Sequence, residues 1–403
     1  MQKVWKTTKI TLTIAILLLT VLVIFNWEKV NRLHSVITLF DKERIVANFS
    51  NMAEAFITKP IVKNGDSSEF TYAPQELPET FTYRDNENSV DEFLARRATT
   101  ALLVIKDNKI TFEDYYLGTK NTDKRISWSM AKSFVVMLFG MQVDAGKIDI
   151  EKPVGFYLPE MKDSGYENVK VKHVLQMSSG VQWNEDYLDF NSDINKMGRM
   201  LAIGGSLDDM STELKEDSTP GEIFHYVSID THVIGMIVRR VSGKSLVDLL
   251  QANIWNKLGM DNDAAWITDS QGAAFALGGL NVSTKDYARF GQLMLNNGNW
   301  HGEQLVSKNW VSEATTPGAD YLKPTATKLG YGYQIWLPTL AIPGEFFFVG
   351  VYGQYIYVNQ QENIVIVKNS ADKDFRDHLD SKQETIQFFR TVVDSFKTLT
   401  VSK

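Results

Sequence analysis

Cysteine is absent from this chain of 403 residues, and its absence removes several kinds of chemistry. A thiol nucleophile, an iron–sulfur cluster, a cysteine-ligated zinc ion and a disulfide framework are all excluded. A lipoprotein-type lipid anchor is excluded as well, because its attachment requires a cysteine. Any nucleophile in this chain therefore has to be another type of residue.

The chain also lacks an excess of basic residues. It has 42 Lys and Arg against 49 Asp and Glu, which gives a net charge of −7 and a pI of about 5.5. A nucleic-acid binder normally carries a basic patch or stripe, and none is present, so we exclude that class of partner. Hydrophobic residues make up 44% and charged residues 23%, the composition of a folded protein with a core of ordinary size.

Two further patterns of hydrolytic enzymes are missing. No Gly-x-Ser-x-Gly elbow occurs, since Gly204-Gly205-Ser206 lacks the closing glycine, so a Ser-His-Asp hydrolase is not indicated. His-x-x-x-His metal spacing is absent, and we predict no metal and no cofactor. His232 is interpreted as a structural histidine.

A long uncharged stretch begins near the N-terminus. Residues Ile10–Phe25 contain no charged side chain and approach the length needed to cross a bilayer. No Ala-x-Ala cleavage pattern follows, and Trp27 suits a membrane interface. We favour an uncleaved signal anchor over residues 1–27, which makes the protein a single-pass protein of the inner (cytoplasmic) membrane with an exported catalytic domain; cleavage would make it secreted. Three lysines precede the stretch: Lys3, Lys6 and Lys9.

The remaining chain divides by pattern into a connector and a globular domain. Residues 28–85 are predicted to be a connector, with a helix over Arg32–Phe56 followed by a polar loop. Residues 86–403 are predicted to be the catalytic domain, which begins with a hairpin of two strands, Thr99–Ile105 and Lys109–Tyr116.

Helices and strands are unevenly distributed along this domain. Residues from about 145 to 300 are mostly of helical pattern and are predicted to form a helical subdomain. Strands at both ends of the domain indicate one sheet, mostly antiparallel, with helices on both faces: an α/β (α+β) fold. The late elements are predicted at Gly330–Trp336, Glu345–Val349, Gln354–Val358 and Ile364–Asn369, with a final helix over Lys382–Lys397.

A Ser-x-x-Lys tetrapeptide, Ser129 to Lys132, opens an apolar helix that stops at Gly146. Residues three apart lie on one helix face, so the two side chains can meet. The following residues are almost all apolar, which predicts burial, and burial lowers the pKa of a lysine until its free amine can act as a base. The Ser129 N–H, at the positive end of the helix, can stabilise an oxyanion.

The tetrapeptide is short enough to recur by chance, and it does so at Ser370–Lys373. That copy lies in a polar, charged segment where no buried helix is expected. The apolar helix therefore favours Ser129 as the nucleophile, and two further segments support the choice.

The first supporting segment follows the turn at Pro220-Gly221 and presents Tyr226, which could carry a proton to a leaving group. Ser228 would face the same side if the backbone is extended. The second is Gly350-Val351-Tyr352-Gly353-Gln354, whose glycines suit a strand edge where a substrate approaches closely. Alone, the tyrosine is more typical of a half-buried packing residue, and the glycines of an ordinary hairpin turn.

These three segments, in this order, resemble the superfamily of class C β-lactamases, DD-peptidases, EstB-type esterases and nylon-oligomer (6-aminohexanoate-dimer) hydrolases. The stretches Val174–Gly180 with Trp183-Asn184-Glu185, and Gly278–Asp286, are similar to the same family, and the resemblance covers about residues 90 to 395. It implies Ser129 as nucleophile, Lys132 as general base, Tyr226 as proton shuttle and the Val351 N–H as second oxyanion donor. We expect Gly350, Ser228, Gln354, Tyr352 and Trp128 around the substrate, and we interpret Glu185 as a loop cap or surface group.

Two departures from the family pattern bear on the substrate. Phe348-Val349-Gly350 stands where β-lactamases carry Lys-Thr-Gly, so the cation that pairs with a substrate carboxylate is missing. Tyr-x-Asn has become Tyr226-Val227-Ser228. We therefore rank neutral small-molecule esters or amides above β-lactams and D-Ala-D-Ala peptides, with the nylon-oligomer hydrolases as the most similar branch. Two alternatives stay open: a DD-peptidase or β-lactamase in which another cation serves, and a catalytically silent envelope protein with this fold.

Overall fold

The computed structural model describes residues 2–375 and 381–397. An eight-stranded sheet forms its centre, and all neighbouring strands are antiparallel except β2 and β6. The two ends of the domain meet in this sheet through the pairing of β16 with β5. In spatial order the strands are β12 (Gly330–Tyr331), β13 (Trp336–Leu337), β14 (Glu345–Gly350), β15 (Gln354–Asn359), β16 (Ile364–Ser370), β5 (Thr99–Lys106), β6 (Lys109–Tyr115) and β2 (Thr71–Tyr72).

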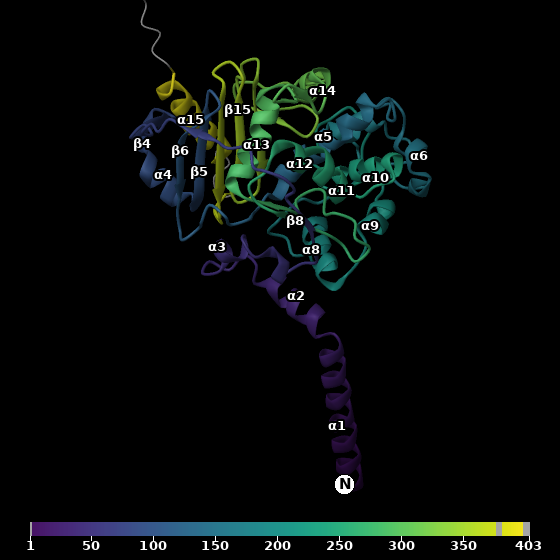
Figure 1. Cartoon of the computed structure of the whole chain (residues 1–403). Helices are drawn as coiled ribbons and strands as arrows, with labels where there is room; N and C mark the ends of the chain where they lie inside the picture. Colours follow the sequence, from purple (N-terminus) through teal and green to yellow (C-terminus); the bar gives the residue numbers. More distant parts are fainter. Residues whose placement is uncertain (1, 376–380, 398–403) are drawn as a thin grey trace, which may run out of the picture.

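Helices cover both faces of this sheet, and the central strands are accordingly buried along nearly their whole length. One face packs against α4 (Val90–Arg96) and α15 (Ser381–Ser395) through a core that includes Phe93, Phe388 and Phe389. The other face packs against α13 (Thr284–Leu295), behind which lies α5 (Ala131–Asp144). Figure 1 shows α13 lying across the strands. The predicted α/β fold is confirmed.

A second sheet and a group of helices complete the body beside α5. The sheet has the order β1 (Thr58–Ile61), β8 (Ala264–Ile267), β9 (Leu280–Val282) and β7 (Arg125–Ile126). The helices are α6 (Val154–Tyr157), α7 (Val171–Leu175), α8 (Asp193–Ile203), α9 (Leu207–Glu213), α10 (Asp230–Ser242), α11 (Leu246–Leu250) and α12 (Asn256–Leu258), with a single π-helical stretch at Gln251–Trp255.

The helical group therefore ends earlier than the sequence pattern indicates. After Leu258 the chain forms β8 and β9, and α13 then packs on the main sheet rather than with the other helices. The cause is periodicity: the short apolar runs of β8 and β9 are too brief to be told from helix by pattern alone. Smaller elements are the hairpins β3 (Thr80–Tyr83) with β4 (Asn86–Ser89) and β10 (Asn299–Trp300) with β11 (Glu303–Gln304), and α14 (Lys308–Ala314).

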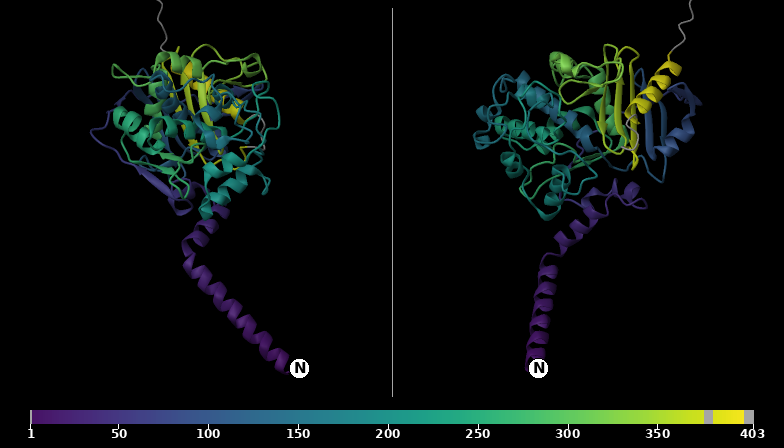
Figure 2. Two further views of the ribbon diagram at one scale, coloured as in Figure 1. Left: turned by 90° about the vertical axis from the view of Figure 1, so that its right-hand side faces the viewer. Right: turned by 180° about the vertical axis from the view of Figure 1, so that it is seen from behind.

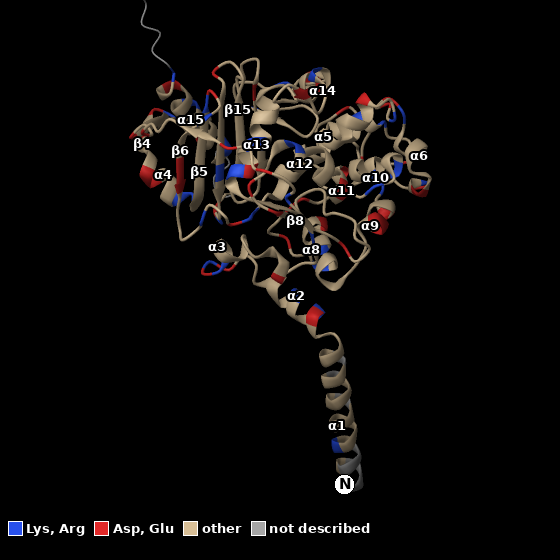
Figure 3. Cartoon of the chain, in the orientation of Figure 1, with Lys and Arg blue, Asp and Glu red and all other residues tan. Residues whose placement is uncertain are grey.

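The N-terminal segment consists of three helices, α1 (Gln2–Phe25), α2 (Trp27–Ile37) and α3 (Ile45–Asn48). The single helix predicted over Arg32–Phe56 is wrong, because the chain turns between α2 and α3. Helix α1 projects away from the body in all three orientations of Figures 1 and 2, and Figure 3 shows no Lys, Arg, Asp or Glu in the half of α1 nearer the body. Its residues Thr8–Phe25 are long and apolar enough to cross a membrane, and none of its described side chains is buried.

Candidate active site

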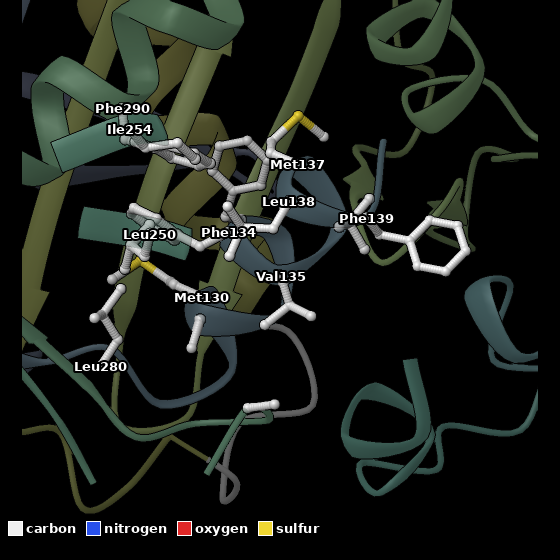
Figure 4. Packing of buried hydrophobic residues seen from close by; sticks show 14 of the residues in the cluster. Met130, Phe134, Val135, Met137, Leu138, Phe139, Leu250, Ile254, Leu280 and Phe290 are labelled. Carbon is white, nitrogen blue, oxygen red and sulfur yellow. The ribbon is translucent and has the colours of Figure 1, made fainter. Parts of the chain in front are cut away.

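Helix α5 is buried on nearly all sides and forms the centre of the largest core cluster, in which Met130, Phe134 and Leu138 pack together (Figure 4). A 3₁₀ turn over Trp128–Met130 leads into it and carries Ser129. Trp128 adopts a positive φ of 42°, a sparsely populated conformation for a residue with a side chain. This sharp entry places the Ser129 N–H at the start of the helix, where it can donate to a ligand rather than to the helix itself.

Lys132 points back along α5 and meets the serine. Its Nζ donates to Oγ of Ser129 at 3.1 Å and to the carbonyl oxygen of Leu277 at 2.6 Å. The side chain is only 1% exposed, and burial lowers the pKa of its ammonium to about 7, against the opposing influence of the Glu185 and Asp230 carboxylates. Near neutral pH a large fraction of this amine is therefore uncharged and able to accept a proton.

Tyr226 lies beside the Ser129–Lys132 pair. The Nζ of Lys132 is 5.4 Å from the centre of its ring, and the ring stacks on Trp336. Burial first, and then the charge of Glu185, raise the pKa of Tyr226 well above its usual range, although hydrogen bonds with Ser129 and Ser228 oppose this. The phenol therefore keeps its proton at neutral pH and suits a relay better than a base.

The end of β14 passes directly over the serine. A Cβ added to Gly350 would lie 2.3 Å from the carbonyl oxygen of Ser127 and 3.1 Å from the amide nitrogen of Ser129. Only glycine allows this approach. Val351, the next residue, lines both cavities that Ser129 also lines, so its backbone borders the space where a substrate carbonyl would lie.

Two cavities meet at Ser129. The first has a volume of about 330 Å³ and apolar walls, among them Phe40, Trp128 and Tyr352. The second, about 510 Å³, is bordered by Glu185, Tyr226 and Lys382 as well as by Trp336 and Val349. Both volumes fall within the range of small-molecule sites.

A sequence model of the β-lactamase family matches residues 86–385, about three quarters of the chain. The chain belongs to the β-lactamase family. A curated member, the 6-aminohexanoate-dimer hydrolase of Paenarthrobacter ureafaciens, is 31% identical over 294 residues, which cover 70% of this chain and 75% of the relative. Family membership and homology of this kind support a hydrolase, and at the family level a serine hydrolase.

Solved structures share the fold of this β-lactamase-family chain. A putative 6-aminohexanoate-dimer hydrolase from Bacillus anthracis matches with a TM-score of 0.77 and 23% identity, covering 89% of this chain and 95% of that one. A class C β-lactamase matches with a TM-score of 0.57 and 16% identity, covering 77% of this chain and 94% of that one. At these identities the likeness concerns the fold alone.

The structure assigns different surroundings to the other residues predicted around the substrate. Trp128 and Tyr352 line the apolar cavity, and Tyr352 stacks on Phe40 with ring centres 4.8 Å apart. Ser228 also lines it, but its hydroxyl donates to Oε1 of Glu185 at 2.6 Å. The Ser228 hydroxyl thus holds the Glu185 carboxylate at the edge of the site.

Gln354 departs most from expectation. Its side chain is fully buried, and its amide nitrogen donates to the carbonyl oxygens of Ser370 at 2.6 Å and Tyr352 at 3.2 Å. Strand β16 shifts register between Asn369 and Ser370, and the Gln354 side chain satisfies backbone groups that this irregularity leaves unpaired. The Gln354 side chain borders neither of the two cavities at Ser129, and its contact with a substrate stays a prediction.

The position of Glu185 inside the site was not predicted from the sequence. Besides Ser228, it accepts hydrogen bonds from Trp183 and, at 2.6 Å, from the hydroxyl of Tyr187, and it borders the second cavity. The Trp183-Asn184-Glu185 motif was the available signal. A second acid, Asp230, is fully buried and accepts a hydrogen bond from Tyr166 at 2.7 Å.

The remaining polar candidates have structural partners. His232 is bonded through Nε2 to Asp208, which also pairs with Arg239, away from the serine. Within residues 2–375 and 381–397, no group of three or more His, Asp and Glu side chains is arranged to hold a metal ion.

Proposed function

We propose that the protein is a serine hydrolase that cleaves an ester or amide through an acyl-enzyme on Ser129. The observation that carries the proposal is the hydrogen bond between the buried Lys132 amine and the Ser129 hydroxyl, at the point where two cavities meet. A nucleophilic hydroxyl needs a base within hydrogen-bond reach, and this pair supplies both.

The reaction begins when Oγ of Ser129 attacks the substrate carbonyl and Lys132 accepts its proton. The N–H groups of Ser129 and Val351 stabilise the oxyanion that forms; a single donor of this kind typically contributes ~10²–10³ in rate. Tyr226 then relays the proton to the leaving group as the tetrahedral intermediate collapses. Water hydrolyses the acyl-enzyme by the same groups in reverse.

Glu185 holds this arrangement in place rather than reacting. It fixes Ser228, whose hydroxyl in turn bonds to Tyr226, so the acid acts through its neighbours. Its negative charge also opposes the ionisation of Tyr226 and keeps the relay protonated. We therefore describe Glu185 as a positioning residue.

The substrate is more consistent with a neutral ester or amide than with a β-lactam. Phe348, at the position of the family lysine, is buried against Phe290 and offers no cation. One observation favours a second candidate, a DD-peptidase or β-lactamase: Lys382 borders the second cavity, with Nζ 4.6 Å from the ring of Trp336, and could pair with a substrate carboxylate.

Covalent labelling tests the proposal and separates the candidates. A fluorophosphonate probe should label the wild-type chain at Ser129, identified by peptide mass spectrometry, and Ser129→Ala should lose both the label and turnover of p-nitrophenyl acetate. Fluorescent penicillin should label it weakly. Strong labelling of Ser129 by penicillin that is lost in Lys382→Ala would instead support the peptidase. No labelling of Ser129 by either probe would support the catalytically silent alternative.

A further inference from the structure

The apolar cavity extends from Ser129 to the end of the body from which α1 leaves. Helix α2 packs against α8 at this end, and the Nε of Arg32 donates to the carbonyl oxygen of Ala202. Both helices contribute walls to the cavity, and Figure 1 shows them near the C-terminal end of α1, where it joins the body. The cavity is thus open toward the segment that carries the predicted membrane span.

Part of the cavity wall comes from residues that precede the part of the chain matched by the family model. These are Val36, Ile37, Leu39, Phe40 and Phe56. Phe40 lies against Trp128, with ring centres 5.9 Å apart, so this segment reaches to within one residue of the nucleophile. The segment of residues 36–56 therefore contributes to the cavity and is not only a connector.

The mouth of this cavity carries exposed apolar side chains. Ile37, Leu188 and Phe190 line it and are 64%, 79% and 66% exposed. Large apolar side chains gathered at the rim of an apolar cavity mark a surface that meets lipid or another apolar partner. Ile37 lies 12 residues beyond Phe25, about 18 Å along a helix, which keeps the rim close to a bilayer crossed by α1.

We infer that the substrate is an ester of a long-chain fatty acid drawn from the bilayer that holds α1, with its acyl chain in the cavity formed by α2, α8 and Trp128. The inference rests on the proposed function of Ser129. It assigns the second cavity, beside Tyr226, to the polar alcohol that leaves. A long apolar chain and a polar leaving group match the different walls of the two cavities at the serine.

In this arrangement each bond that forms during the reaction is matched by a bond that breaks. Oγ of Ser129 forms a bond to the acyl carbon, and the bond from that carbon to the alcohol oxygen breaks. The hydroxyl proton passes through Lys132 and Tyr226 to the departing alcohol. Water then cleaves the acyl-enzyme, releasing the fatty acid and restoring the serine.

Gly198 offers a direct test. It lies on the face of α8 that also presents Ile194 and Leu201 to the cavity, and a Cβ built on it meets no heavy atom within 4 Å. Gly198→Phe therefore fills the cavity without a backbone clash. Each buried CH₂ contributes about fourfold in binding, so in this variant the ratio of kcat/KM for p-nitrophenyl octanoate over acetate should fall at least about tenfold.

Ser312→Phe, at an exposed position of α14, adds the same ring at the opposite end of the body and should leave this ratio at its wild-type value. An unchanged ratio in Gly198→Phe, with acetate turnover still dependent on Ser129, would overturn the acyl-chain site and leave the proposed function standing. Absence of Ser129-dependent turnover of both esters would overturn the proposed function itself.

A second measurement tests the bilayer as the source. The full-length chain is inserted into vesicles of phosphatidylethanolamine and phosphatidylglycerol that contain p-nitrophenyl palmitate, or is mixed with separate vesicles that contain the ester. Hydrolysis should be at least about tenfold faster in the shared vesicles. Leu188→Glu, a change at an exposed rim position, should reduce this advantage. Equal rates in the two preparations would contradict a substrate drawn from the anchoring membrane.

Discussion

Two serine–lysine pairs lie within this fold, and comparing them shows what a catalytic pair requires. Lys132 bonds to Ser129 at 3.1 Å, and Lys368 bonds to Ser370 at 2.5 Å. Both lysines are 1% exposed, and burial lowers the pKa of each ammonium to about 7. A buried amine beside a hydroxyl therefore does not by itself make an active site.

The surroundings of the two pairs differ. Ser129 lines two cavities, whereas Ser370 is fully buried in β16 and lines neither of them. Lys368 shares its interior with Arg97 and Asp372, which act on its pKa in opposite directions. Access for a substrate separates a reactive pair from a structural one.

The turn between β14 and β15 contacts both serine–lysine pairs, and one glycine lies at each contact. Gly350 leaves room for Ser127 and the Ser129 amide, while a Cβ on Gly353 would lie 3.0 Å from Cβ of Ser370. The sequence pattern predicts that both glycines face the substrate. In the structure, each glycine is instead required by a different close contact. Gly353 also needs its positive φ of 82°.

The two pairs should differ most in how the acylation rate responds when each lysine is replaced. Lys132→Met should slow acylation by p-nitrophenyl acetate by ~10²–10⁴, because general base catalysis is lost. Lys368→Met, a matched change at the buried pair, should leave the acylation rate within about twofold. Stopped-flow measurement of p-nitrophenol release gives both values, and comparable losses would show that the pairs are not distinct.

A tyrosine lies near each lysine, Tyr226 near Lys132 and Tyr355 near Lys368. Removing their hydroxyl groups should change kcat by different amounts, but the difference should be smaller than for the lysines. Tyr226→Phe should lower kcat by about 10², because the proton relay to the leaving group is removed. Tyr355 lies opposite Lys368 in the sheet, and Tyr355→Phe should keep kcat near the wild-type value. A kcat for Tyr226→Phe equal to that of the wild type would remove the tyrosine from the mechanism.

The two glycines should separate activity from stability. Gly350→Ala forces the strand away from Ser129 and should lower kcat/KM by about tenfold or more, since small displacements of reacting groups are costly. Gly353→Ala should instead lower the free energy of unfolding by about 1–2 kcal/mol because of its positive φ. Kinetics and thermal unfolding of both variants check this, and the reverse pattern would refute it.

The smallest expected effect concerns the pH dependence of stability, to which both lysines should contribute. Below pH 7 both amines are protonated in the folded and unfolded states; between pH 7 and about 10.5 only the unfolded state keeps its proton, so stability rises with pH. Replacing either lysine by methionine should reduce this rise, by as much as about 1.4 kcal/mol per pH unit. Urea unfolding at several pH values measures the slope, and a slope unchanged in both variants would show that neither amine is neutral.

The sequence predicted the contact between Ser129 and Lys132 because it depends on local spacing and on one apolar helix, whereas Tyr226 was assigned through the family resemblance. Glu185 could not be recognised in the same way, since its contact with Ser228 joins residues 43 apart. The cavity wall formed by Phe40 was missed for a related reason. The pattern around Phe40 predicts one long helix, because no strong helix stop precedes the turn between α2 and α3.

The pH dependence of acylation is the most direct measurement of the central claim, that an uncharged Lys132 takes the Ser129 proton. With a fluorophosphonate or p-nitrophenyl ester under single-turnover conditions, the rate should rise with pH through an apparent pKa near 7 and then level off. In Lys132→Met this step should vanish. A wild-type rate that stays flat from pH 5 to 9, or that rises only near the ordinary lysine pKa of ~10.4, would contradict the account.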